Sequence, residues 1–296
     1  MADKRCTPDE AVARLKSGMT IGIGGWGARR KPMSLVRALL RSDIEDLTIA
    51  SFGGPDVGML CAAGKVSKVV YAFVSLDSIP LEPHFRAARQ SGAVAAEEYD
   101  EGQFLLALQA AAWHTPFLPT RVGLGSDVAA HNPRLATVTS PFAGADGAPP
   151  EELIAVPALE LDAALVHYNV GDARGNAGFT GPDQYFDDLL LEAASTGGRI
   201  VSVERVVSTA ELRDTAGCEH RLRVNRMMVD AVVEAPNGAH PTSCDPDYAT
   251  DELAIAGYAA SAKSPEAWDA YRDEWLAFPD EATYQARLHD RAEVPS

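Results

Sequence analysis

Short apolar runs alternate with amphipathic stretches over most of this chain. Apolar runs bounded by turn residues predict strands, and apolar residues at helical spacing predict the helices between them. The expected strands are a short one that begins at Met19, then 47–52, 68–74, 94–98, 153–156, 163–168, 199–206 and 228–234, and the expected helices are 8–17, 33–42, 57–63, 82–92, 103–113 and 186–194. This alternation favours an α/β fold, with an open, mainly parallel sheet and helices on both faces.

Three regions depart from the alternation. Residues 128–151 are rich in proline and glycine and are expected to form a long irregular insertion. Residues 169–178 contain three glycines and are expected to form a turn. Residues 250–290 show an amphipathic helical pattern, so we expect a helical extension over about 250–296. Because no repeat or linker-like change of composition interrupts the chain, we predict one domain, residues 1–296.

The segment after the first strand combines glycines with three successive cations. Its sequence is Gly-Ile-Gly-Gly-Trp-Gly-Ala-Arg-Arg-Lys-Pro, from Gly22 to Pro32, and a helix follows. A glycine turn before a helix leaves backbone amides open to an anion, and the cations would add charge at the same place. The candidate substrate-binding residues here are Gly24, Gly25, Trp26, Gly27, Arg29, Arg30 and Lys31.

Three later strand ends are expected to meet this turn. Gly53 and Gly54 follow the strand 47–52, Ser75 follows 68–74, and Glu101 follows 94–98. Carboxyl ends of parallel strands share one edge of a sheet, where ligands bind in open α/β folds. Glu101 also fits a simpler interpretation, because acids are common at the start of a helix.

Other site chemistries find little support in the sequence. The spacing of Gly22, Gly24 and Gly27 matches a dinucleotide-binding turn, but no acid stands at the end of the second strand to hold a ribose. A turn that only packs a helix on a strand remains the alternative. No two of the seven histidines have ligand-like spacing, so no metal is expected.

Composition narrows the possible partners and location. The chain has 296 residues, 46% of them hydrophobic, and a formal net charge of −16, which argues against nucleic acid and anionic membranes as partners. No apolar stretch is long enough for a membrane span, and the first residues lack the apolar core of a signal peptide. Four cysteines without paired spacing are expected to be reduced thiols. We therefore expect a cytoplasmic protein.

Several blocks together resemble the alpha subunit of the family I coenzyme A transferases. The most specific are Val-Pro-Ala-Leu-x-Leu-Asp from Val156, Gly-Asp-x-x-Gly-Asn from Gly171, Val203-Glu204, and Gly-Ala-His-Pro-Thr-Ser from Gly238. The resemblance covers most of the chain. It implies an open α/β fold, an acyl-CoA substrate, and a homologous beta subunit that carries the attacking glutamate of the transferases.

The glycine turn and the sequence Phe-Val-Ser-Leu-Asp-Ser from Phe73 are closest to a subgroup, the alpha subunits of steroid ring-cleaving hydrolases. This resemblance implies hydrolytic opening of the last steroid ring of a cyclohexenone carboxyl-CoA, and we expect the chain to act in an αβ or α2β2 complex. In the subgroup the acid–base group is expected in the alpha chain, where Glu101 is the candidate. CoA is then part of the substrate and no cofactor is needed. A transferase alpha subunit and a non-catalytic acyl-CoA-binding protein remain the alternatives.

Overall fold

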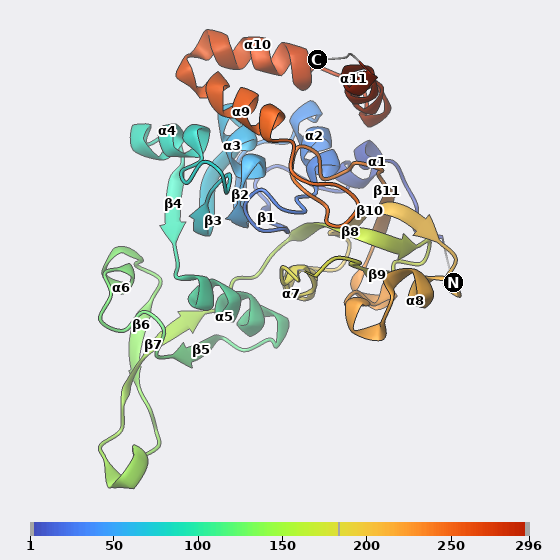
Figure 1. Ribbon diagram of the computed structural model, residues 1–296. Helices are drawn as coiled ribbons and strands as arrows, with labels where there is room; N and C mark the ends of the chain where they lie inside the picture. Colours follow the sequence, from blue (N-terminus) through green and yellow to red (C-terminus); the bar gives the residue numbers. More distant parts are fainter. Residues whose placement is uncertain (1–2, 183, 294–296) are drawn as a thin grey trace.

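A computed structural model describes residues 3–182 and 184–293 of the chain (Figure 1). The strands are β1 (Thr20–Ile23), β2 (Leu47–Gly53), β3 (Val66–Val74), β4 (Ala95–Glu98), β5 (Phe117–Thr120), β6 (Ala136–Thr139), β7 (Glu152–Pro157), β8 (Ala163–Asp172), β9 (Ala177–Gly178), β10 (Arg199–Val207) and β11 (Ala231–Glu234). The helices are α1 (Pro8–Val12), α2 (Met33–Arg41), α3 (Pro55–Ala62), α4 (Pro83–Ser91), α5 (Glu101–Ala112), α6 (Val128–His131), α7 (Asp187–Ala193), α8 (Leu212–Ala216), α9 (Glu252–Ala260), α10 (Pro265–Trp275) and α11 (Glu281–Glu293).

The main sheet has the order β11-β10-β8-β1-β2-β3-β4, and these neighbours are all parallel. The short strand β9 pairs antiparallel with β8. The central strands are apolar on both sides because helices cover both faces of the sheet. Successive residues of β2 show this, since Ile49 packs with α2 and α3 while Ala50 faces the core that contains α5. Figure 1 shows α2, α3, α4 and α9 above the sheet and α5 and α7 below it. The predicted open, mainly parallel α/β fold is confirmed.

The predicted irregular insertion is wrong in part. Residues 128–151 contain α6 and β6, and β6 pairs antiparallel with β7 in a second sheet of order β5-β7-β6. The pairing continues beyond β6, because the Ser140 amide donates to the Glu151 carbonyl at 2.8 Å. In Figure 1 this hairpin projects from the body as an arm. Proline and glycine at its tip obscured the short β-branched strand Ala-Thr-Val-Thr.

Two other boundaries also differ from the sequence expectation. The turn expected at 169–178 begins later, because β8 continues to Asp172 and the chain returns as β9. The Asp172 carboxylate holds this turn by accepting from the amides of Arg174 and Asn176, each at 3.0 Å. The C-terminal pattern is three helices, α9 to α11, because Ser264 caps α10 and Pro279 precedes α11. The single-domain assignment stays a prediction.

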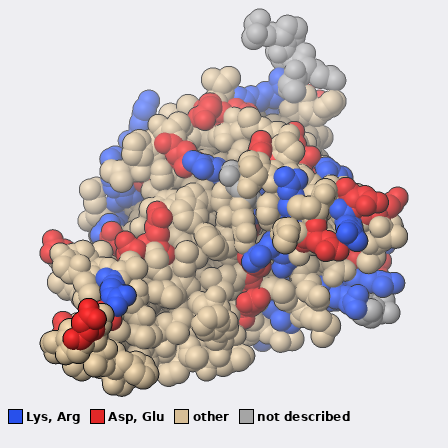
Figure 2. Space-filling model, turned by 60° about the horizontal axis from the view of Figure 1, so that its bottom comes forward, with Lys and Arg blue, Asp and Glu red and all other residues tan. Residues whose placement is uncertain are grey.

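Figure 2 shows a broad face without Lys, Arg, Asp or Glu over the region of α5 and β5. Residues 102–120 contain none of these four types, although 23% of the chain is charged. After Glu101, helix α5 has no charged residue and only two polar side chains, Gln103 and Gln109, and Leu105 and Leu106 remain partly exposed. Trp113, at the end of α5, is 62% exposed. A helix with so few polar side chains is normally buried, so this face has the character of an interface.

The C-terminal helices are joined to the body through Glu82, the N-cap residue of α4. Its carboxylate accepts from the Phe85 amide at 2.5 Å and from the Tyr258 hydroxyl of α9 at 2.7 Å. Burial raises the pKa of Glu82 to about 7, although these hydrogen bonds act in the opposite direction. Ionisation of Glu82 therefore opposes folding at and above neutral pH.

A pH-dependent loss of stability follows from this raised pKa. The folded protein binds the Glu82 proton more tightly than the unfolded chain does, so the stabilisation is complete below pH 4.5 and is lost as the pH rises through 7. Glu82→Gln removes this ionisation. Its unfolding free energy relative to the unchanged chain should rise by about 3 kcal/mol between pH 4.5 and 8, measured by urea unfolding. A difference independent of pH would contradict the assignment.

Candidate functional site

The carboxyl edge of the main sheet brings the predicted turns together. The Gly27 amide donates to the Phe52 carbonyl at 3.2 Å, and the Ser75 amide donates to the Gly53 carbonyl at 3.0 Å. Arg29 and Asp77 form an ion pair of 2.9 Å across the turns after β1 and β3. The expectation that the turns after β1, β2 and β3 meet at one edge is therefore confirmed.

An aromatic cluster forms the wall of this edge. Trp26 stacks on Phe52 with ring centroids 4.3 Å apart and also contacts Phe73 at 5.2 Å. Phe104 of α5 meets Phe52 edge-on at 4.8 Å. The outer ring, Trp26, is only partly buried. Such a wall suits an apolar ring. Sequence reasoning named Trp26 but missed the three phenylalanines, whose signal was their position at strand ends and in the first turn of a helix.

The backbone amides of the glycine turns are used within the chain. The Gly24 amide donates to the Leu165 carbonyl at 2.9 Å, and the Gly25 amide donates to the Asp187 carboxylate at 2.8 Å. The Gly54 amide donates to the Asp56 carboxylate at 2.7 Å, and the Gly27 amide donates to the Phe52 carbonyl. We therefore correct the expectation that these four amides are open to an anion. Substrate contact through other atoms of these turns stays a prediction.

Two of the three successive cations point into the protein. Lys31 is fully buried and lies 3.2 Å from the Asp56 carboxylate, and its ammonium also donates to the Phe52 carbonyl at 2.6 Å. Arg30 donates to Asp187 at 3.1 Å. Burial lowers the pKa of Lys31 and raises that of Asp187, while the neighbouring opposite charges counteract both shifts. Arg30 and Lys31 therefore balance internal acids, and their contact with substrate stays a prediction.

Arg30 is further enclosed by aromatic rings. Its guanidinium lies 4.9 Å from the ring centre of Tyr168, 4.8 Å from that of Tyr185 and 5.4 Å from that of Phe179. Its backbone is left-handed, with φ of 46°. Arg30 thus anchors the glycine turn to β8 and α7. The exposed cation of the triplet is Arg29, whose side chain is 47% exposed.

Glu101 is the first residue of α5 and is exposed. The helix is capped by its neighbour, since the Asp100 carboxylate accepts from the Gly102 amide at 2.8 Å and Gln103 completes a capping box. Among the described residues the Glu101 carboxylate has no hydrogen-bond or ion-pair partner. The capping interpretation therefore applies to Asp100. In this chain by itself, the Glu101 side chain lies in water.

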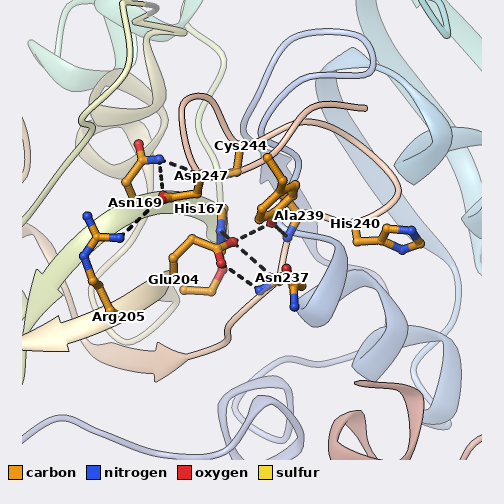
Figure 3. Close-up of polar contacts among 12 residues, drawn as sticks. His167, Asn169, Glu204, Arg205, Asn237, Ala239, His240, Cys244 and Asp247 are labelled. Carbon is orange, nitrogen blue, oxygen red and sulfur yellow. Dashed lines mark hydrogen bonds and ion pairs between the residues drawn. The ribbon is translucent and has the colours of Figure 1, made fainter. Parts of the chain in front are cut away.

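A buried network lies farther along the same edge (Figure 3). His167 of β8 bonds to Glu204 of β10 at 2.7 Å and to Ser202 at 2.8 Å. Glu204 also accepts from the Tyr248 hydroxyl at 2.5 Å and from the Asn237 amide at 2.7 Å. Burial raises the pKa of Glu204, but its hydrogen bonds, first that of His167, outweigh burial and hold it below the ordinary value. Sequence reasoning treated His167 and Glu204 separately and missed their pairing.

This network is the one place among the described residues where a metal could be considered. His167, Glu204 and Cys244 offer ligand atoms within 4.8 Å of one another. Burial raises the pKa of the Cys244 thiol far above its usual range, so the thiolate that a metal needs is disfavoured. The oxygens of Glu204 already accept from four donors, including the Gly238 amide. The donor set therefore fits a structural network better than a metal centre.

The network supports the glycine turn through the loop 235–248. Ser34 at the start of α2 donates its amide to the Gly238 carbonyl at 2.8 Å, and the Arg30 amide donates to the Ser243 carbonyl at 2.6 Å. Glu204 binds the same loop through Asn237 and Tyr248. The buried network thus holds in place the turn that presents Trp26 and Arg29.

Comparison with known proteins places this geometry among acyl-CoA enzymes. The model of the coenzyme A transferase family matches residues 5–235. A cholesterol ring-cleaving hydrolase IpdA subunit from Rhodococcus jostii strain RHA1 is 56% identical over 98% of this chain and 97% of its own length.

Two solved structures show the same fold. The crystal structure of glutaconate coenzyme A-transferase from Acidaminococcus fermentans has a TM-score of 0.86 at 29% identity, over 96% of this chain and 92% of that chain. The crystal structure of a variant of the decarboxylase AibA/AibB has a TM-score of 0.76 at 29% identity, over 98% of this chain and 100% of that chain.

Proposed function

This chain belongs to the coenzyme A transferase family, and from that membership we propose that it is the alpha subunit of a steroid ring-cleaving hydrolase. The substrate is a cyclohexenone carboxyl-CoA, and the reaction opens its ring by hydrolytic cleavage of a carbon–carbon bond. The observation that carries the proposal is Glu101, an exposed carboxylate without a partner among the described residues, whose capping role is filled by Asp100. The similarity to the IpdA subunit supports the choice of substrate.

The reaction requires a group that moves protons at this edge. In a β-keto thioester conjugated to a ring alkene, the β carbon is electrophilic. Glu101 takes a proton from water as the oxygen adds there, and gives it to the α carbon, where the addition leaves an enolate. Glu101 then takes the proton of the resulting tertiary alcohol, which collapses in a retro-aldol step. That step breaks the ring bond and leaves an enolate, to which Glu101 returns a proton. The Trp26, Phe52 and Phe73 wall is suited to hold the ring beside it.

A homologous beta subunit completes the site in this proposal. The similar proteins are named as subunits, in the ring-cleaving hydrolase and in a glutaconate transferase. The uncharged face over α5 provides a surface for such a subunit, and Glu101 is the first residue of the same helix. A docked subunit would exclude water from around Glu101. We propose an α2β2 assembly with a cytoplasmic location.

An ordinary CoA transferase is the second candidate, favoured by the structural match to glutaconate coenzyme A-transferase. In that case CoA passes between two acids through a glutamyl thioester on the partner subunit, and Glu101 has no chemical role. The two reactions differ in their requirement for a second acid.

Turnover of a cyclic enone-CoA by the co-expressed pair should not require an added carboxylic acid. Water is the co-reactant of the hydrolase, so the rate with acetate or succinate should equal the rate without it. Product formation is followed by liquid chromatography, with this chain alone as the inactive control. A rate that depends strictly on the acid, together with a hydroxylamine-sensitive thioester on the partner, would establish the transferase instead.

A further inference from the structure

A cavity of about 540 Å³ adjoins the aromatic wall on its outer side. It lies between the end of β3, the segment 80–82 and helix α4. Phe73 belongs both to the aromatic cluster and to the lining of the cavity. Glu98, the last residue of β4, also lines it and precedes Glu101 by one short connection. The cavity thus adjoins the proposed catalytic edge through Phe73.

The cavity exists because β4 is shorter than β3. The two strands pair from Lys68 with Ala95 to Tyr71 with Glu98, and the chain then leaves the sheet toward α5. No strand covers this side of residues 72–74 in the part of the chain that the structure describes. Space therefore opens beside the last residues of β3, which a longer β4 would otherwise cover.

The lining combines apolar side chains with two arginines of α4 and with Glu82, Gln90 and Glu98. Its apolar members include Phe73, Val74, Pro80, Leu81 and Phe85. Leu81 is 59% exposed and lies at the rim of the cavity. The volume lies in the range of sites for small organic ligands, which are mostly apolar with a few placed polar groups.

The two arginines of the lining differ in what they contact. Arg89 pairs with Glu98 at 3.1 Å, and its guanidinium lies 5.6 Å from the ring centre of Tyr71. Arg86 is exposed, and its guanidinium has no hydrogen-bond or ion-pair partner among the described residues. Glu82 also lines the cavity but is only 1% exposed, and its oxygens accept from Tyr258 and from backbone amides. Within the described lining, Arg86 is therefore the cation that lacks a counter-charge.

We propose that this cavity binds the end of the acyl group remote from the thioester, and that this end is an apolar chain or ring terminating in a carboxylate. The apolar walls take the hydrocarbon, and Arg86 pairs with the carboxylate by charge-assisted hydrogen bonds. The proposal rests on the proposed function, because it assigns part of the substrate of that reaction. It makes Arg86 a specificity-determining residue.

Binding by matched ligands tests the cavity. The co-expressed pair carrying Glu101→Gln is titrated with a cyclic enone-CoA that bears a terminal carboxylate and with its methyl ester. Adding Arg86→Ala should raise Kd for the acid about 10- to 100-fold and leave Kd for the ester unchanged. Arg213→Ala, at an exposed arginine in α8, is the matched control and should alter neither value.

A second variant tests the walls of the cavity. Leu81→Asp places a negative charge at the rim and should weaken the acid more than the ester, without disturbing the core, because Leu81 is exposed. Equal effects of Arg86→Ala on acid and ester, or no effect on either, would overturn the cavity assignment. Binding is measured without turnover, so this result is independent of the acid-dependence test. A rate that requires an added acid would contradict the proposed hydrolase, whereas the binding result bears only on the cavity.

Discussion

Replacing Glu101 with glutamine should lower turnover of the cyclic enone-CoA by the co-expressed pair about 10²- to 10⁴-fold while the substrate still binds. Glutamine keeps the shape of the side chain but cannot take the proton from water or return one to the enolate. The helix remains capped, because Asp100 and Gln103 form the capping box. The loss should therefore appear in kcat, measured by steady-state kinetics, with Kd from calorimetry unchanged.

Glu252 provides a matched control for this change. It is also an exposed glutamate at the first position of a helix, α9, and it also follows an aspartate N-cap, Asp251. Any general effect of removing a first-turn charge should be the same at both positions, so Glu252→Gln should retain full turnover. If Glu101→Gln retained turnover as well, Glu101 would have no part in the chemistry and the proposed hydrolase would lose its acid–base group.

Arg30→Ala should destabilise the fold by about 3–5 kcal/mol, because it leaves the Asp187 carboxylate buried without its counter-charge. The side chain of Asp187 has no exposed surface, and that of Arg30 is 4% exposed. The variant also removes the guanidinium from among Tyr168, Tyr185 and Phe179. Urea unfolding followed by tryptophan fluorescence measures the loss. If Arg30 also touches substrate, the same substitution should raise KM or lower kcat/KM by about tenfold.

Arg29→Ala separates the structural from the binding contribution. Its ion pair with Asp77 lies at the surface, so its removal should change stability by less than about 1 kcal/mol. If the exposed cation meets the anionic substrate, KM should rise by about tenfold in a protein of unchanged stability. A large loss of stability in Arg29→Ala with none in Arg30→Ala would reverse the roles that the structure gives them.

The order of the strands and helices could be predicted because it depends on local apolar patterns. Runs such as Ala163–Tyr168 are buried on both faces, and glycine turns mark the carboxyl ends where the site lies. The hairpin of β6 and β7 escaped prediction because β6 is only four residues long and is mostly exposed. Its pairing depends on a partner strand, which periodicity within one segment does not reveal.

The direction of each charged side chain could not be predicted for a different reason. The sequence placed Arg29, Arg30 and Lys31 side by side, but the acids that neutralise two of them are Asp56 and Asp187, far apart in the chain. Similarly, Glu204 and His167 meet only because β8 and β10 are neighbours in the sheet. Such pairs depend on strand order and on left-handed turns like that at Arg30, which a list of residue types does not contain.

The uncharged face over α5 makes the behaviour of this chain depend on how much partner subunit is made with it. With the partner docked as proposed, Leu105, Leu106 and Trp113 are covered; in a chain made in excess they stay in water, where apolar surfaces associate with one another. Chaperones and proteases act on such surfaces. Production of the two subunits in equal amounts, as from one shared messenger RNA, removes the exposed intermediate. The composition of one helix thereby favours balanced synthesis of the two subunits.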